Sequence, residues 1–363
     1  MNGSNTTTSI SYPEALESMP LWMKVVVILI QVVGISANAI VFAGIAHIKL
    51  GSLLTTKLLL SQSVFDGLIS LVALLKAVGP PFWYTGNSML DTMLCHLWFS
   101  YFTFWLFVLL SMCNLVCTAF DRLNAVVYNK TYQKRQKIYL ALCYSCIVVY
   151  SITLASINPL LLEFHNNECI PSHSKRGNWI DTLIKIDSVC WPLFSYTIPC
   201  AAVILMYSKI ITELRKPSSA SRASPANQSM DRIQNIRKRP RHRRIAHSLT
   251  IATCIMQTLF LLTHAHDRIY YFLGINHWIE YRVGSLPHLL GLWLITLNSC
   301  LNPAALVFTM KTLQQWILCR VRTTTVTTAE SDNLQSDRVL LDLLRSRSAK
   351  LSLNDAVTPS TNL

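Results

Sequence analysis

Long apolar stretches are the feature that most constrains how this chain can fold. A helix that crosses the roughly 30 Å apolar core of a bilayer needs about 20 residues. Six stretches of at least that length contain no Asp, Glu, Lys or Arg, and a seventh, slightly shorter one contains a single acid, Asp66. These stretches are residues 25–46, 58–75, 92–120, 138–162, 188–208, 245–266 and 283–310. We therefore predict an all-α membrane protein, a seven-transmembrane helix bundle.

The composition and the positions of the charges agree with this prediction. Of the 363 residues, 52% are hydrophobic and 14% are charged, whereas about 25% are charged in an average soluble domain. The net charge of +14 could suggest nucleic-acid binding, but Lys and Arg are concentrated in the loops at 47–57, 121–137 and 209–244. Short basic loops stay in the cytoplasm. We predict no nucleic-acid partner, and a multi-pass plasma-membrane protein with its N-terminus outside and its C-terminus inside.

The spans divide the chain into an outer tail, a bundle and an inner tail. The Ser- and Pro-rich run 217–225 cannot bury a core and is expected to be disordered. The basic run 237–244 is an orientation signal that attracts anionic lipid, and a contact surface for a cytoplasmic partner is compatible with that role. The predicted plan is an extracellular tail 1–22, a transmembrane bundle 23–309 with a disordered basic loop 209–244, an amphipathic membrane-surface helix 310–320 and a cytoplasmic tail 321–363.

Residues 311–320 have the pattern of a helix that lies on a membrane surface. Leu313, Trp316 and Ile317 share one face at helical spacing, while the polar residues between them can face water. Cys319, at the end of this stretch, is either a palmitoylation site or a buried thiol.

Two glycosylation sequons lie in the outer tail. Asn2 and Asn5 each begin an Asn-X-Ser/Thr sequence that the glycosylation enzymes can reach. Asn129 and Asn227 also begin such sequences, but the topology places them in the cytoplasm. We therefore expect glycans on Asn2 and Asn5 only.

The cysteine positions predict one disulfide. Most of the eleven cysteines fall within spans, Cys190 lies near the outer end of the fifth span, and Cys319 is cytoplasmic. Only Cys95, at the mouth of the third span, and Cys169, in the second outer loop, lie clearly in the oxidising extracellular space. We expect these two residues to be bonded.

Polar groups inside the spans are costly and usually face the interior of the bundle. Here they are Asn38, Asp66, Ser111, Asn114, Asn298, Ser299 and Asn302. With their neighbours they resemble, in order and across essentially all seven spans, the motifs of the rhodopsin-like (class A) G protein-coupled receptors. The matching residues are Asn38-Ala-Ile-Val41, Asp66, Cys95-His-Leu-Trp98, Asp121-Arg122-Leu123, Pro159, Pro199 with Tyr207, and Asn298-Ser299-Cys300-Leu301-Asn302-Pro303.

The chain departs from that pattern mainly at the activation switch. Leu123 replaces the family's usual Tyr, and the run 263–266, Thr-His-Ala-His, stands where Cys-Trp-x-Pro is usual. The fourth span lacks the family's Trp, and no Tyr ends the seventh-span motif. Cys95 is two residues further from Arg122 than is typical. These differences concern switching more than the fold.

The resemblance implies an ion site in the middle of the bundle. Asp66, Ser111 and Asn298 would hold an allosteric Na⁺ ion, with water completing its oxygen shell. The alternative is that Asp66 is a structural acid held by Asn298 and Asn302. No other cofactor is expected.

The resemblance also implies a signalling switch at the inner end. Asp121 would lock Arg122, which would then be released toward Tyr207 and a heterotrimeric G protein as the sixth span swings outward; Asn302 and Pro303 belong to the same switch. Arrestin and receptor kinases are further partners that the resemblance implies. Without it, Arg122 is an interfacial arginine whose charged end reaches water.

Two other classes of function fit less well. His264, His266 and Asp267 could suggest the metal site of a membrane hydrolase. Histidines two apart on a helix point roughly 200° from each other, so they cannot share one ion. A membrane transporter or channel is the alternative, although only Asp66 lies near mid-membrane to couple an ion. We expect no enzymatic activity.

The outer halves of the spans indicate the ligand's character. Phe104 stands where aminergic receptors carry Asp, and Thr296 where opsins carry Lys, so amines and retinal are excluded. A basic and aromatic set favours an anionic group, best the terminus of a peptide such as a neuropeptide. Alternatively, the lysine and arginine of this set reach into water at the outer leaflet. The candidate ligand-binding residues are Lys76, Phe104, Trp191, His264, Arg268, Tyr271 and His288.

Overall fold

The computed structural model describes residues 21–48, 50, 52–79, 84–171, 178–215, 231–276, 278–280 and 285–320. Within them, seven helices are long and apolar enough to cross a membrane, which confirms the predicted fold class. These spans are Leu21–His47, Leu53–Val78, Phe102–Val127, Tyr132–Leu160, Lys185–Glu213, His247–Gly274 and Leu286–Thr309.

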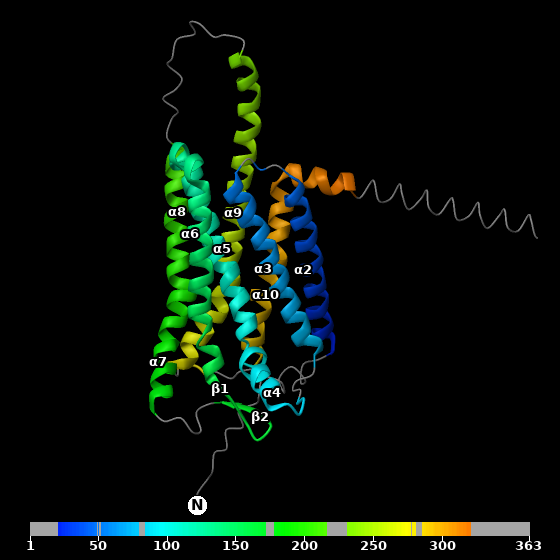
Figure 1. Ribbon diagram of the computed structural model, residues 1–363, viewed down its shortest axis with the longest axis vertical. Coiled ribbons are helices and arrows are strands. Elements are labelled where there is room, and N and C mark those ends of the chain that lie inside the picture. Colours follow the sequence, from blue (N-terminus) through cyan, green and yellow to red (C-terminus); the bar gives the residue numbers. More distant parts are fainter. Residues whose placement is uncertain are drawn as a thin grey trace, which may run out of the picture. The chain divides into compact units, whose positions relative to one another are not determined.

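Figure 1 labels the α-helices and β-strands, and these labels are used from here on. In chain order they are α2 (Leu21–His47), α3 (Leu53–Val78), α4 (Ser88–Leu94), η1 (Cys95–Phe99), α5 (Phe102–Val127), α6 (Asn129–Ala155), η2 (Asn158–Leu161), β1 (Leu162–His165), β2 (Glu168–Pro171), α7 (Asn178–Pro192), η4 (Leu193–Thr197), α8 (Ile198–Arg215), α9 (Asp231–Ile275) and α10 (Leu286–Thr309). The elements α7, η4 and α8 together form the fifth span.

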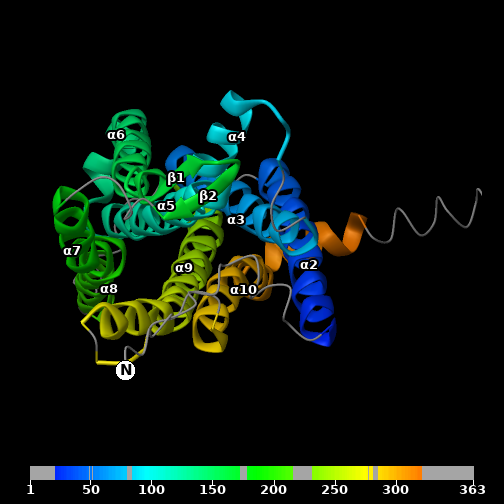
Figure 2. The same ribbon diagram turned by 90° about the horizontal axis from the view of Figure 1, so that it is seen from below.

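The third span, α5, lies at the centre of the bundle. It contacts α3, α6, α8 and α9, and Figure 2, the view from below, shows α3, α6 and α9 around it. Apolar side chains of α5 pack against both neighbouring groups of helices. One cluster joins Phe104 and Val108 to α3 and α10, and another joins Ala119 to Val203 and Ile210 of α8. The central position of α5 places its polar residues between the other spans.

Close packing of α2 depends on Gly34. A Cβ atom at this position would lie 2.5 Å from Sγ of Cys300 and 2.6 Å from Oγ of Ser70. Small residues let transmembrane helices approach closely. Gly34 therefore sets the distance between α2 and its neighbours α3 and α10.

The chain enters α5 through a break. α4 ends at Leu94, the π-helical turn η1 follows, and Tyr101 has a left-handed backbone (φ 60°). A bulky left-handed residue interrupts a helix, and a π turn holds more residues than an α turn. The predicted start of the third span at residue 92 is therefore wrong, because α5 begins at Phe102.

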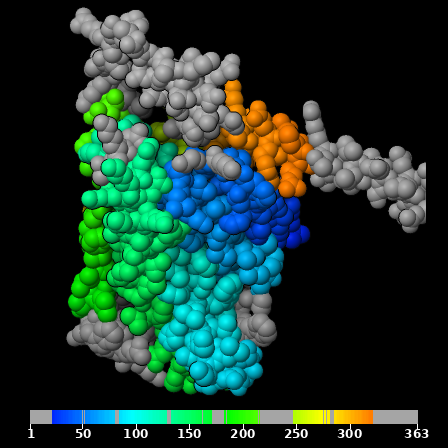
Figure 3. All heavy atoms as spheres, turned by 45° about the horizontal axis from the view of Figure 1, so that its top comes forward, coloured from blue at the N-terminus to red at the C-terminus, as the bar shows by residue number. Residues whose placement is uncertain are grey.

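The second outer loop forms a short β-hairpin. β1 and β2 pair antiparallel, and Asn166 and Asn167 turn the chain with positive φ, which Asn tolerates well. Cys169 of β2 is bonded to Cys95, which confirms the predicted disulfide. The hairpin lies beside η1 and α4 at one end of the bundle (Figure 3).

Helices extend further than expected into the third inner loop. α8 continues to Arg215 and α9 begins at Asp231, so residues 209–215 and 231–244 of the loop expected to be disordered are helical. Arg, Lys and Gln, which make up most of 231–244, are good helix formers, and the helix continues through Pro240 in the same run. Residues 216–230 lie outside the described part of the chain, as do the tails 1–20 and 321–363. Residues 311–320 are helical, so a short eighth helix follows α10.

Candidate functional site

Three spans meet at one buried carboxylate, that of Asp66. Its side chain is 0% exposed. Gln62, one turn earlier in α3, donates from Nε2 to both carboxylate oxygens at 3.0 Å. Ser111 of α5 donates to Oδ1 at 2.7 Å, and Asn302 of α10 donates to Oδ2 at 2.9 Å. Asp66 therefore joins α3, α5 and α10.

These contacts differ from the set expected for Na⁺. Of the two expected partners, Ser111 contacts Asp66, but the α10 contact comes from Asn302; in the described residues Oδ1 of Asn298 has no hydrogen-bond partner. A carboxylate has about four lone-pair sites, and four hydrogen bonds already reach this one. The residues present do not fit a cation bound to Asp66. The hydrogen bonds instead favour the alternative, in which Asp66 is a structural acid.

Asn38 ties α2 to the same region. Its Nδ2 donates to the backbone oxygens of Gly34 and Ser299, each at 2.9 Å. The second bond crosses from α2 to α10, next to the Asp66 contacts. The polar residues of four spans are thus used to join helices.

Arg122 is held at the cytoplasmic end of α5 by its neighbour Asp121. Its guanidinium donates to Oδ2 of Asp121, from Nε at 3.0 Å and also from Nη2, and to the hydroxyl of Thr55. Asp121 also accepts hydrogen bonds from Thr55, at 2.7 Å, and from the Tyr132 hydroxyl. The predicted pairing of Asp121 with Arg122 is present, and it is joined to α3 and α6.

Tyr207, the other predicted switch residue, faces α9. Its hydroxyl donates to Oγ1 of Thr253 at 2.7 Å, and its ring packs against Ala119. Arg122 and Tyr207 therefore each have other partners in this structure. Pro303 lies inside α10, directly after the Asn302 that reaches Asp66.

In the outer half of the bundle, Lys76 lies in an aromatic cage. Its Nζ donates to the backbone oxygen of Trp98 at 2.7 Å and lies 4.4 Å and 3.6 Å from the ring centroids of Trp98 and Tyr101. Within the described residues, no carboxylate forms an ion pair with Lys76. Cation–π contacts and one carbonyl thus hold an ammonium group that has no anionic counterpart there.

Arg268 has different surroundings. Its guanidinium carbon lies 4.9 Å from the rings of both Trp105 and Trp191, and Nη1 lies 3.3 Å from Oδ2 of Asp267. Arg268 is buried. An acid of the protein already balances this charge, so of the two predicted basic residues Lys76 is the better placed for an anionic ligand.

The remaining candidate residues gather around Arg268. His264 is buried against Phe260 with ring centroids 4.2 Å apart, and Tyr271 is hydrogen-bonded to Asp187 of α7. His288 of α10 is also buried. The structure therefore divides the predicted ligand set into two groups. Lys76 and Phe104 lie between α3, α5 and α10, and Trp191, His264, Arg268, Tyr271 and His288 lie between the fifth, sixth and seventh spans.

A chain of aromatic rings connects these groups. Phe104 packs edge-to-face against Tyr101 and against Trp105, with centroids 6.4 and 5.3 Å apart, and Trp105 packs edge-to-face against Trp191 at 5.4 Å. Edge-to-face packing is a favourable geometry for aromatic pairs. The chain runs from the cage of Lys76 to the two tryptophan rings next to Arg268.

A family model described as "7 transmembrane receptor (rhodopsin family)" matches residues 37–305. The match covers most of the chain and all of the sites above. The chain belongs to the rhodopsin family of seven-transmembrane receptors. No curated protein sequence matches it significantly.

Membership of the rhodopsin family decides the broad class of function. Members are multi-pass proteins of the plasma membrane whose partners are, in general, an extracellular ligand and a G protein, and they are generally not enzymes. This assignment places the chain with receptors rather than with transporters or channels.

The sequence reasoning missed several residues of this receptor's sites. Gln62 contacts both Asp66 and Ser111, but it is not among the polar span residues predicted from the sequence. Its spacing of four from Asp66, which puts both on one helix face, was the available signal. Thr55 and Tyr132 at the Arg122 site gave no comparable signal, because hydroxyl groups are common near span ends.

Proposed function

We propose that this receptor binds an extracellular ligand through an anionic group, best the terminus of a peptide, and activates a heterotrimeric G protein through Arg122. Family membership supports the general part of this proposal. The observation that supports the ligand class is the position of Lys76 in a cavity of the outer half.

That cavity has a volume of about 60 Å³. Among the described residues that line it are two lysines and no acid. It is lined by Lys24, Val27, Gln31, Ala73, Lys76, Ala77, Tyr101, Phe104, Leu289, Leu292, Trp293 and Thr296. A cavity that holds the ammonium group of Lys76 between apolar walls favours an anionic ligand group, which would pair with that ammonium group.

The size of the cavity limits which part of a ligand enters it. About 10–15 Å³ of such volume is enough to hold one water, so about 60 Å³ has room for a carboxylate and the atoms attached to it. The rest of a peptide would lie in the outer mouth of the bundle, near the hairpin β1–β2. A peptide with a free carboxyl terminus therefore fits better than a bulky lipid acid.

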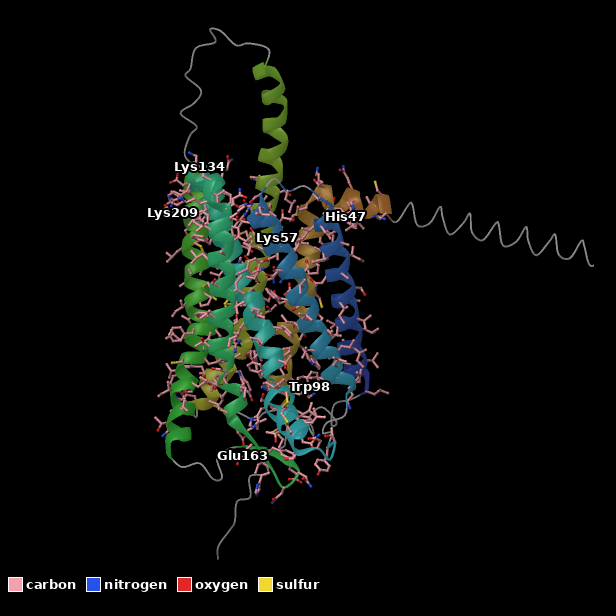
Figure 4. All side chains as sticks on the ribbon, in the orientation of Figure 1. His47, Lys57, Trp98, Lys134, Glu163 and Lys209 are labelled. Carbon is pink, nitrogen blue, oxygen red and sulfur yellow. A yellow bond between two sulfur atoms is a disulfide. The ribbon has the colours of Figure 1, made fainter. Side chains whose placement is uncertain are left out.

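The orientation in the membrane belongs to the same proposal. Lys57, Lys134 and Lys209 lie at one end of the bundle, and Trp98 and Glu163 at the other (Figure 4). Basic residues favour the cytoplasmic side, and disulfides form outside the cell. Both arguments favour an orientation with Arg122 at the cytoplasmic end of the bundle and the Lys76 cavity in its extracellular half.

Other partners and modifications stay predictions. Cys319 is exposed, as palmitoylation requires. Asn2 and Asn5 lie outside the described residues. Binding of arrestin and receptor kinases is expected by analogy with the family.

A ligand screen in cells, read out by calcium and cyclic AMP together, tests the proposal. Once an active ligand is found, Arg122→Ala should abolish the signal while the surface level, measured by antibody labelling, stays the same. The reason is that Arg122 is the proposed contact to the G protein. If signalling survives in Arg122→Ala, this role for Arg122 is wrong.

A further inference from the structure

Gln62 is a buried amide in the middle of a transmembrane helix. It is 2% exposed and lies one turn before Asp66 in α3. An amide in such surroundings is costly unless its hydrogen bonds are made. Its Nε2 donates to both oxygens of Asp66 and to Oγ of Ser111, the last at 2.6 Å.

The orientation of this amide is fixed by a second amide. Nδ2 of Asn114 donates to Oε1 of Gln62 at 2.8 Å and to the backbone oxygen of Leu58 at 2.9 Å. Because Asn114 offers a donor, Gln62 must present its oxygen to Asn114 and its nitrogen to Asp66. The N–H groups of Gln62 are thus directed at the carboxylate.

The amide nitrogen lies where a cation bound at Asp66 would have to lie. It bridges both carboxylate oxygens and the Ser111 hydroxyl, which are the oxygen ligands that a small hard cation would take. Asn302 and Ser111 fill the remaining lone pairs of the carboxylate. We infer that Gln62 replaces the cation at Asp66 with its own amide, so that this receptor is insensitive to sodium.

Other buried oxygens nearby do not change this conclusion. The hydroxyls of Ser70 and Ser299 and the amide oxygens of Asn114, Asn298 and Asn302 have no hydrogen-bond partner among the described residues. All five are neutral, and neutral buried oxygens are ordinary partners for water. A cation placed among them would still find both oxygens of Asp66 occupied.

The test measures thermal unfolding of the purified full-length receptor in detergent. Sodium chloride is replaced by choline chloride or potassium chloride at equal ionic strength, so that only the identity of the cation changes. The wild-type unfolding midpoint should be the same in all three salts. A midpoint that rises specifically with sodium would overturn the inference, and this measurement needs neither a ligand nor a variant.

The variant Gln62→Ala removes the amide and leaves space beside Asp66. Its midpoint should be lower in choline than that of the wild type, and sodium should raise it by about 2 °C or more, the shift expected for a binding energy near 1 kcal/mol. If Gln62→Ala does not yield folded receptor, Gln62→Ser gives the same test, because it also vacates the site. Absence of any sodium effect in the folded variant would show that Gln62 is not what excludes the ion.

A matched control is Gln257→Ala. Gln257 is also a buried amide, and it donates to the backbone oxygen of Leu115 at 2.6 Å, away from Asp66. This variant should lose stability without gaining sodium dependence. An equal sodium effect in Gln257→Ala would mean that any loosened bundle responds to sodium, and the inference would fail.

Discussion

The guanidinium of Arg122 is held by its neighbour in α5 and by a residue at the cytoplasmic end of α3. Its partners are Asp121 and Thr55, and Asp121 is held in turn by Tyr132. Among the described side chains of α9, none forms an ion pair with Arg122. In the described part of the chain, the lock on Arg122 therefore depends on the partners of Asp121.

Tyr132→Phe should raise ligand-independent signalling. The change removes one hydrogen bond to a charged group, which is worth about 1.5–3 kcal/mol, and so frees Asp121 and Arg122 more easily. The ligand-independent signal is measured as the basal second-messenger level at matched surface expression. The control is Tyr139→Phe, because Tyr139 stacks on Tyr132 with centroids 6.2 Å apart, and none of the described contacts joins it to Asp121. Equal basal signals in wild type and Tyr132→Phe would contradict the prediction.

Lys76→Ala should lower the potency of an acidic ligand by about 10-fold or more, which corresponds to about 1.4 kcal/mol of binding free energy. Comparing an acidic ligand with its amide, which lacks the negative charge, separates the contribution of the charge from that of packing. Wild-type receptor should prefer the acid, whereas Lys76→Ala should bind the two forms equally.

Arg268→Ala is the comparison for Lys76. Because Asp267 already pairs with Arg268, this change should lower the potency of the acidic ligand and of its amide to a similar degree. The loss would come from the missing contacts with Trp105 and Trp191. Unchanged potency in both variants would remove the anionic-pocket hypothesis.

At the scale of the helices, close approach decides the packing of α2. Gly34→Ala should lower the unfolding midpoint and the surface level, because its Cβ would meet Cys300 and Ser70 at 2.5 and 2.6 Å. Gly67→Ala is the matched control, since its Cβ would lie 3.6 Å from Cβ of Asn38, an ordinary contact. Alanine is a better helix former than glycine by about 1 kcal/mol, so Gly67→Ala should be neutral or stabilising. Equal losses in both variants would argue against this account of α2.

The helices themselves could be predicted, because about 20 apolar residues in a row have few other uses. Their breaks could not: nothing in the local sequence marks Tyr101 as left-handed. The sequence leaves open which residue of the seventh span contacts Asp66, for a related reason. Asn298 and Asn302 are four residues apart and share a helix face, so only the height of α10 relative to α3 selects Asn302.

At the scale of the whole molecule, the two ends of the bundle carry different labelled charges (Figure 4). The end with Lys57, Lys134 and Lys209 also carries Arg122, while the end with Glu163 carries the disulfide-bonded hairpin. A ligand that enters near the hairpin is separated from Arg122 by the polar contacts around Asp66. α5 contributes to all three regions in turn, with Phe104, Ser111 and Arg122, so it is a direct connection between the two ends.

Glycan mapping by mass spectrometry tests this orientation directly. Asn2 and Asn5 should carry glycans, because the outer position of the N-terminus exposes both to the glycosylation enzymes. Asn129 begins an equally good sequon at the start of α6, on the basic end of the bundle, and Asn227 lies in the loop between the fifth and sixth spans. Both should be unmodified. Sugar on Asn129 would place the basic end outside, and the proposed positions of the Lys76 cavity and of Arg122 would then be reversed together.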